Sequence, residues 1–167
     1  MIIKKYKTRD ITKKLLIADR DGTLNIDCGY PHKIEELILN DKIIKNLKNY
    51  SHLLEVAIVT NQSGISRGYF DTSDAHNFND ELVKKLKYNG IQVTSIIICP
   101  HKPQDNCACR KPNPLMVEHT IIINKAIKKE CFMIGDKESD EQSACKANIN
   151  YECVSTKMKK FEEWINE

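Results

Sequence analysis

The chain has 167 residues, of which 41% are hydrophobic and 29% charged, and this composition is typical of one folded domain rather than of a disordered segment. A formal net charge of +3 is too small to indicate nucleic-acid binding. No apolar run approaches the roughly 18 residues that a membrane-spanning helix needs, so we expect no transmembrane segment.

The first 14 residues are basic and lack the apolar stretch that a secretory signal requires. We predict that this N-terminal extension is a solvated tail rather than a binding arm, and that the protein is cytoplasmic. The chain contains seven cysteines. In a reducing compartment, cysteines are more commonly metal ligands than disulfide partners, so their spacing becomes informative.

Strand-like runs alternate with helix-like stretches along the chain. We predict strands at residues 15–19, 55–60, 93–99, 131–135 and 151–154, and helices at 41–50, 73–88, 114–128, 139–147 and 159–165. Asn113 is expected to be the N-cap of the third helix. The alternation predicts an α/β fold, a three-layer sandwich with a central parallel sheet, in a single domain over residues 1–167.

Polar residues follow the first four predicted strands. Asp19 and Asp21 follow the first strand, and the other three are followed by residues 60–64, 99–101 and 135–137. In open parallel sheets, ligands bind beyond the carboxyl ends of the strands. We therefore expect these residues to share one site.

Asp19 and Asp21 are the candidate catalytic carboxylates. Residues two apart on an extended segment point the same way, and Gly22 permits a sharp turn directly after them. A nucleophilic Asp19 can form an acyl-phosphate, which splits one difficult displacement into two easier steps. Asp21 would then protonate the leaving oxygen and activate the hydrolytic water. Alternatively, the pair simply forms an Asx-type turn.

Asp136, after the fourth strand, points to a divalent cation. Asp19, Asp136 and a phosphate monoester dianion would together bring about four negative charges to one place. Mg²⁺ prefers oxygen ligands, and it would balance these charges and polarise the phosphoryl group. Asp21 could add its backbone carbonyl to the ligand set. The alternative role for Asp136 is to cap the following helix.

Lys111 and Thr60 are expected to stabilise the transferring phosphoryl group, since its oxygens need positive charge and hydrogen-bond donors. The turn at residues 61–64 can present backbone amides to substrate oxygens. Arg110 offers a planar guanidinium for a second phosphate or for sugar oxygens; alternatively, it forms a surface ion pair.

Four soft metal ligands lie within residues 99–109, and this density is typical of a zinc site: Cys99, His101, Cys107 and Cys109. Three thiolates and one imidazole leave no open position on a tetrahedral ion, so we predict structural Zn²⁺. This zinc-binding loop leads directly into Arg110 and Lys111 and would hold both at the rim of the site. Incidental cysteines are the alternative.

Several short motifs resemble those of haloacid-dehalogenase-type phosphatases and occur in the same order. They are Asp19-Arg20-Asp21-Gly22-Thr23, residues 60–64, Lys111 within Cys109-Arg110-Lys111-Pro112, and Gly135-Asp136-Lys137. The resemblance implies a Rossmann-like core and Mg²⁺-dependent phosphomonoester hydrolysis through an aspartyl-phosphate. The zinc loop is similar to that of a branch that acts on heptose 1,7-bisphosphate or on histidinol phosphate. Residues 27–32 and 61–68 resemble the heptose-acting members, which remove the 7-phosphate on the route to nucleotide-activated heptose.

The resemblance also implies residue roles. Asp19, Asp21 and Asp136 would hold Mg²⁺. The small sugar bisphosphate would contact Asp27, Cys28, Gly29, Tyr30, Thr60, Asn61, Gln62, Ser63, Arg110, Lys111 and Lys137. Only 40 residues separate Asp19 from Thr60, too few for a separate cap domain, so we expect loops to shape the pocket of a monomer. The alternatives are a histidinol-phosphate phosphatase and a non-catalytic, zinc-stabilised binding module.

Overall fold

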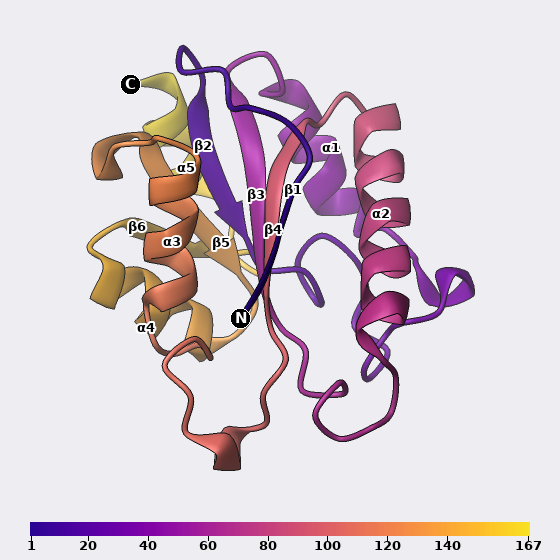
Figure 1. The fold of residues 1–167 in the computed structure, drawn as a ribbon. Helices are drawn as coiled ribbons and strands as arrows, with labels where there is room; N and C mark the ends of the chain where they lie inside the picture. The colour runs from indigo at the N-terminus through magenta and orange to yellow at the C-terminus, as the bar shows by residue number, and fades with distance from the viewer.

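Six strands form one sheet between two layers of helices in the computed structural model, which describes residues 1–167 (Figure 1). The strands are β1 (Ile2–Lys5), β2 (Lys14–Ala18), β3 (Leu54–Asn61), β4 (Val93–Cys99), β5 (Cys131–Gly135) and β6 (Asn150–Cys153). The α-helices are α1 (Asp41–Asn49), α2 (Thr72–Tyr88), α3 (Leu115–Ile123), α4 (Glu138–Ala147) and α5 (Lys159–Asn166). Short 3-10 helices occupy Ile34–Glu36, Pro103–Asp105 and Lys128–Glu130.

The sheet has the strand order β1-β4-β3-β2-β5-β6, and every pair of neighbours is parallel except β1 with β4. A helix connects each parallel strand to the next one along the chain, as crossover connections require. The predicted α/β sandwich with a central parallel sheet is confirmed, with one antiparallel strand added at an edge.

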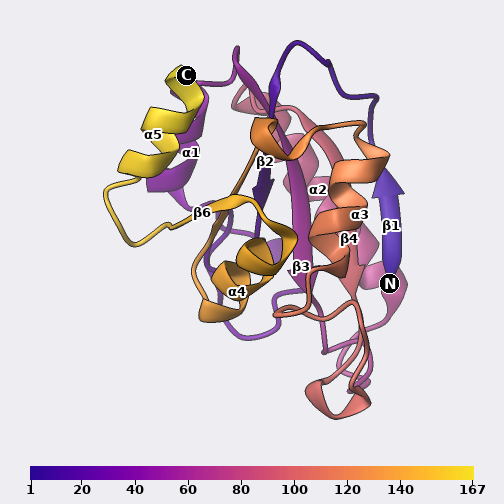
Figure 2. The ribbon, with the colours of Figure 1, turned by 90° about the vertical axis from the view of Figure 1, so that its left-hand side faces the viewer.

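The central strands are continuous apolar runs because both of their faces are buried. In β2, Leu15 and Ile17 pack into one core cluster, whereas Leu16 and Ala18 pack into the other. This alternation serves two helical layers. Helices α1 and α2 cover one face and α3 and α4 the other (Figure 1). Helix α5 packs into the same core cluster as α1 and α2, and it lies beside α1 in Figure 2.

The N-terminal extension is not the solvated tail that its charge predicts. Residues 2–5 form β1, which pairs with β4 so that Ile2 lies opposite Ile98. The segment after β1 is held by Glu55, which is 1% exposed and accepts hydrogen bonds from Lys7 and from the backbone amide of Asp10. A strand of four residues is too short to show a clear alternation of apolar and polar side chains. Its lysines instead favoured the prediction of a solvated tail.

The third predicted helix is shorter than expected and begins differently. Helix α3 ends at Ile123, and Lys125 adopts a left-handed backbone conformation with a φ of 50°. Its N-cap position is Pro114, not Asn113, and the Asn113 side chain instead donates to the carbonyl of Cys107 across 3.1 Å. Asn113 therefore stabilises the zinc-binding loop rather than the helix.

The carboxyl ends of β2, β3, β4 and β5 meet at one edge of the sheet, at the bottom of Figure 1. The segment between β4 and α3, which contains the zinc-binding loop, extends furthest from this edge. None of the helices combines the length and the apolar character needed to cross a membrane.

Candidate active site

Three carboxylates and one lysine meet where β2 and β5 end. Oxygen atoms of Asp19, Asp136 and Asp140 all lie within 4.8 Å of one another. Lys111 Nζ lies 2.6 Å from Asp19 Oδ1 and 2.6 Å from Asp140 Oδ1, and it donates to the carbonyl of Val59. The predicted grouping of Asp19, Lys111 and Asp136 is therefore present in the structure, with Asp140 as an additional member.

Asp140 was not predicted from the sequence. It lies in the first turn of α4, four residues after Asp136, and it is completely buried. Its Oδ2 accepts a hydrogen bond from the backbone amide of Lys137. A carboxylate in the first turn of a helix is commonly interpreted as a solvent-exposed cap, whereas this one is a buried cap that also holds Lys111.

The burial of these groups changes their proton affinities. Burial raises the pKa of Asp19 to about 7, against the opposing attraction of Lys111. Burial alone would lower the pKa of Lys111, but Asp19 and Asp140 outweigh it and raise that pKa. The lysine is therefore held as a cation beside the candidate nucleophile.

Two glycines let the backbone approach the carboxylates closely. A Cβ atom on Gly22, whose φ is 85°, would lie 2.3 Å from Asp136 Oδ2. A Cβ atom on Gly135 would lie 2.4 Å from Asp140 Oδ2. Any larger residue at either position would displace a carboxylate from the site.

The carboxylate cluster fits a hard cation. Asp136 Oδ1 is buried and has no hydrogen-bond partner, and burial raises the pKa of Asp136. A buried carboxylate oxygen without a partner is costly unless a cation completes its surroundings. Asp19 and Asp136 are therefore suited to bind Mg²⁺, as the sequence predicted.

Asp21 is held apart from this cluster by a full set of hydrogen bonds. Arg20 donates from Nε and Nη2 to its two carboxylate oxygens, both across 2.9 Å. Asn25 and Gln62 add one bond each, across 2.9 and 2.7 Å. Although burial works to raise the pKa of Asp21, Arg20 and these donors lower it.

Arg20 had no predicted role, yet it is 1% exposed. Besides Asp21, its guanidinium donates to Asn79 Oδ1 on α2 and to the carbonyl of Pro31. It also lies over the ring of Phe78 at 4.4 Å. Arg20 thus connects Asp21 to α2 and to the loop that contains Pro31.

The residues after β3 organise the catalytic groups through their side chains. Gln62 Nε2 donates to Thr60 Oγ1 across 2.8 Å as well as to Asp21. The Asn61 side chain donates to the carbonyl of Lys111 and accepts from its backbone amide, both across 3.1 Å. Asn61 and Gln62 were predicted from resemblance to contact substrate, and here their side-chain groups position Lys111, Thr60 and Asp21.

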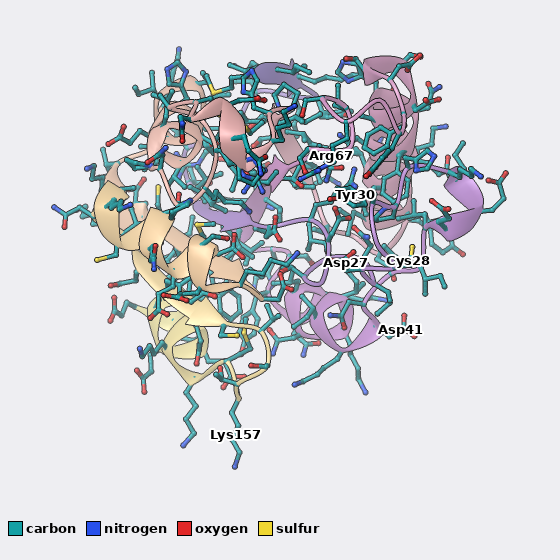
Figure 3. All side chains as sticks on the ribbon, turned by 90° about the horizontal axis from the view of Figure 1, so that it is seen from below. Asp27, Cys28, Tyr30, Asp41, Arg67 and Lys157 are labelled. Carbon is teal, nitrogen blue, oxygen red and sulfur yellow. The ribbon has the colours of Figure 1, made fainter.

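A cavity of about 290 Å³ opens above these groups. Most of the predicted substrate contacts line it, and Ser139 is an unpredicted addition; the lining residues are Asp21, Asp27, Gly29, Tyr30, Asn61, Gln62, Ser63, Arg110, Lys111, Lys137 and Ser139. Figure 3 shows the molecule from the edge of the sheet at which this site lies. Cys28 is exposed and does not line the cavity, and Thr60, 1% exposed, lies beneath it.

The mouth of the cavity carries charges of both signs. Lys137 Nζ lies 3.2 Å from Asp27 Oδ2, in an ion pair between residues that are far apart in the sequence. Burial alone would lower the pKa of Lys137, but Asp136, Asp19 and Asp27 raise it. Lys137 therefore remains a cation at the mouth.

The four predicted zinc ligands converge on one point. The sulfur atoms of Cys99, Cys107 and Cys109 are separated by 3.3 to 3.6 Å, and His101 Nδ1 lies 3.4 Å from the Cys109 sulfur and 3.7 Å from that of Cys99. Tetrahedral zinc with bonds of about 2.0 to 2.3 Å requires ligand atoms roughly 3.5 to 3.8 Å apart. This donor set fits Zn²⁺ with no open coordination position.

The zinc-binding loop is connected to the cavity through Arg110. Its Nη1 donates to the carbonyl of His101 across 3.1 Å, and its side chain lines the cavity. The next residue, Lys111, is fixed by Asn61. The loop therefore holds Arg110 directly, whereas Lys111 is held by Asn61 after β3.

Comparison with known proteins agrees with this geometry. Residues 5–154 match the model of the haloacid dehalogenase-like hydrolase family. The chain is 36% identical, over 158 residues, to D-glycero-beta-D-manno-heptose-1,7-bisphosphate 7-phosphatase of Helicobacter pylori, covering 92% of this chain and 91% of that protein. It is 35% identical, over 144 residues, to the corresponding alpha-anomer phosphatase of Photorhabdus laumondii, covering 81% of this chain and 79% of that protein.

A solved structure extends the likeness to three dimensions. The D,D-heptose 1,7-bisphosphate phosphatase of B. bronchiseptica, complexed with magnesium and phosphate, superimposes with a TM-score of 0.74 at 32% identity, covering 83% of this chain and 78% of that one. The two chains therefore share the fold that positions the site described above. The chain belongs to the haloacid dehalogenase-like hydrolase family.

Proposed function

We propose that the protein is a Mg²⁺-dependent phosphatase that removes the 7-phosphate of D-glycero-D-manno-heptose 1,7-bisphosphate, on the route to nucleotide-activated heptose. The observation that carries this proposal is the 2.6 Å pairing of Lys111 with Asp19 beneath a cavity that Arg110 and Lys137 also line. One cation serves the reacting phosphate, and two remain for the rest of a doubly phosphorylated sugar. The names of the relatives support the same substrate.

In the first step, a carboxylate oxygen of Asp19 attacks phosphorus while the bond between phosphorus and the sugar oxygen breaks. The departing oxygen takes a proton from Asp21, which must carry one at that moment. The four hydrogen bonds to Asp21 favour its ionised form. Protonation therefore requires that the carboxyl group give up some of these bonds when the substrate is bound.

In the second step, water attacks phosphorus in the aspartyl-phosphate. Asp21, now ionised, accepts a proton from that water, the bond between Asp19 and phosphorus breaks, and inorganic phosphate leaves. Arg20 favours the form of Asp21 that this step needs. Asp19 is regenerated as a carboxylate beside Lys111.

The surrounding groups stabilise the charge that moves during both steps. Lys111 is held rigidly and provides positive charge without reorganisation, and Thr60 provides a hydroxyl donor. Asp19, Asp136 and the backbone carbonyl of Asp21 would hold Mg²⁺. When bound, this ion supplies further positive charge that polarises the phosphoryl group.

We also propose that the enzyme acts in the cytoplasm as a monomer, on a small molecule and not on nucleic acid or membranes. All seven cysteines are free, and the thiolates of a zinc site persist in a reducing compartment. The modest net charge of +3 supports a small-molecule substrate over nucleic acid.

Phosphate release from purified protein with Mg²⁺ tests the proposal. Both anomers of the heptose bisphosphate and histidinol phosphate are compared, and we expect kcat/KM to be far higher for a bisphosphate. Asp19→Asn should reduce turnover to background with unchanged circular dichroism and zinc content. A preference for histidinol phosphate would assign the chain to that reaction instead, and no turnover of any phosphate ester would support a non-catalytic binding module.

A further inference from the structure

Two loops at the mouth of the cavity are joined by aromatic contacts. One loop, residues 27–32, follows β2, and the other, residues 64–70, follows β3. The rings of Tyr30 and Tyr69 meet edge to face, with centroids 5.1 Å apart and an angle of 79°. The rings of His32 and Phe70 are stacked, with centroids 4.8 Å apart and an angle of 9°. Each loop thus packs against the other at two consecutive places.

Tyr30 is in a backbone conformation that it would not adopt unaided. Its φ is 55°, in the left-handed region that is unfavourable for a bulky side chain. Such a conformation persists only where neighbouring contacts enforce it. His32 Nδ1 bonds to the carbonyl of Tyr30 across 2.8 Å, and Tyr69 packs against its ring. Tyr30 lines the cavity, so these contacts determine where one wall of the cavity stands.

The 64–70 loop is itself anchored rigidly. Phe70 is 7% exposed, and a Cβ atom on Gly64 would lie 2.1 Å from its ring. The ring is therefore seated directly against the backbone at the start of the loop. Because Phe70 is fixed, the neighbouring Tyr69 is presented to Tyr30 in a defined position.

Tyr69 has no evident role in the stability of the core. It is 57% exposed and does not line the cavity. Its aromatic contact is with the ring of Tyr30. Seen from the carboxyl edge of the sheet, Tyr30 lies between Asp27 and Arg67, which belongs to the 64–70 loop (Figure 3). Tyr69 therefore bears on the wall of the cavity through its contact with Tyr30.

We infer that Tyr69 is a positioning residue for substrate size: it holds Tyr30 at the mouth of the cavity and so sets the fit of the part of the substrate beyond the reacting phosphate. The inference rests on the proposed function, since it concerns a polyhydroxy phosphate ester large enough to reach Tyr30. Under the proposed function, the reacting phosphate would bind at Lys111 and Asp19, beneath the cavity that Tyr30 lines.

The test compares Tyr69→Ala with Tyr69→Phe, which keeps the ring. Tyr88→Ala is the matched control, because Tyr88 is 92% exposed at the end of α2. The substrates are the heptose bisphosphate and acetyl phosphate, which is too small to reach Tyr30. Tyr69→Ala should raise KM for the bisphosphate by roughly three- to tenfold, the change that corresponds to one aromatic pair, with kcat within about twofold. KM for acetyl phosphate should be unchanged, and Tyr69→Phe should behave as the wild type.

Three results would overturn the inference about Tyr69: an unchanged KM for the bisphosphate, an equal rise of KM for both substrates, or an equal defect in Tyr69→Phe. These results leave the proposed function intact, because the wild type still hydrolyses the bisphosphate. If the wild type hydrolyses acetyl phosphate but not the bisphosphate, the proposed function fails and the inference fails with it. The wild-type rate on the bisphosphate therefore separates the two failures.

Discussion

Lys111 is the residue on which the electrostatics of the site depend. It is buried between Asp19 and Asp140, and the loss of a charge partner in such a place leaves an uncompensated buried carboxylate. Motif spacing predicted Asp19, Lys111 and Asp136, because these residues lie at strand ends or in a recognisable motif. It did not predict Asp140 or Arg20, because their importance comes from burial, which a single sequence does not display.

Asn61→Leu should weaken catalysis by releasing the backbone of Lys111. The substitution removes two hydrogen bonds of the kind worth about 1 kcal/mol each, so we expect a loss of about 2 kcal/mol in the free energy of unfolding. Because Lys111 then loses its fixed position, kcat should fall more than KM rises. Urea unfolding and steady-state kinetics measure the two effects.

Asn61→Asp is the control, since it keeps the acceptor for the Lys111 amide and loses only the donor. It should show a smaller loss of stability than the leucine variant. A leucine variant with wild-type kcat and altered KM alone would show that Asn61 acts on the substrate and not on Lys111.

The stability of the magnesium-free protein should decrease as the pH rises from about 4 to about 7. The pKa of Asp19 rises from its ordinary value of 3.8 to about 7 on folding, so the folded chain binds more protons than the unfolded chain over this range. The raised pKa of Asp136 acts in the same direction. Mg²⁺ should raise the unfolding midpoint more at pH 8 than at pH 5, because it binds the ionised carboxylates.

Thermal unfolding with and without Mg²⁺ measures this dependence, in buffers free of chelators so that zinc is retained. Asp21 does not account for this pH dependence, because its pKa is lowered. The stability that Asp21 contributes is lost only at more acidic pH. Asp19→Asn should flatten the dependence between pH 4 and 7. A midpoint that rises with pH in the magnesium-free wild type would contradict the assignment.

At the scale of secondary-structure elements, the central strands were predicted from the sequence more accurately than the end of α3 and the contacts of the zinc-binding loop. The strands β4 and β5 were predicted with their observed bounds, since buried runs between polar residues are unambiguous. The end of α3 was not, because Asn124 and Lys125 carry no strong stop signal. The zinc-binding loop was recognised from ligand spacing, yet its contact from Arg110 to His101 needed the structure.

Cys107→Ser should remove zinc and disturb the placement of Arg110. The zinc-binding loop has little regular structure beyond Pro103–Asp105, so metal binding supplies most of its order. We expect zinc content to fall from about one ion per chain towards zero, the unfolding midpoint to drop, and KM for the bisphosphate to rise. Metal analysis, thermal unfolding and kinetics provide the three measurements.

Cys145→Ser is the matched control, because Cys145 is exposed and lies outside the cluster. It should keep the zinc content, stability and KM of the wild type. A Cys107→Ser protein that retained full zinc and wild-type KM would exclude the assigned ligand set.

At the scale of the whole molecule, β1 closes the sheet on the β4 side. The composition and the alternation of strand-like with helix-like segments predicted the three layers but not β1. In this four-residue strand, partly buried side chains alternate with exposed ones, and none is fully buried. Its partners are distant in sequence: Lys4 forms an ion pair with Asp80 of α2 across 2.6 Å, and Tyr6 donates to the same carboxylate. The N-terminal segment therefore contacts both β4 of the sheet and helix α2.

Deletion of residues 1–5 should destabilise the protein and promote its association. The deletion exposes the backbone groups of β4, whose seven residues are all buried in the intact protein, and β4 would then be an unprotected edge strand. We expect a lower urea midpoint and concentration-dependent oligomers in light scattering, with active-site residues still in place. The double substitution Lys4→Ala and Tyr6→Phe, which keeps the strand, should lower the midpoint less and leave the protein monomeric.

The pairing of β1 with β4 also constrains the order in which the chain folds during synthesis. Lys4 lies opposite Ile96, so residues 2–5 leave the ribosome long before their partner strand exists. Contacts with such large sequence separation form late because of the entropy of closing the intervening loop. Lysines on an edge strand disfavour pairing with other chains. Lys4 and Lys5, whose charge led to the prediction of a solvated tail, are therefore suited to keep this segment unpaired until β4 emerges.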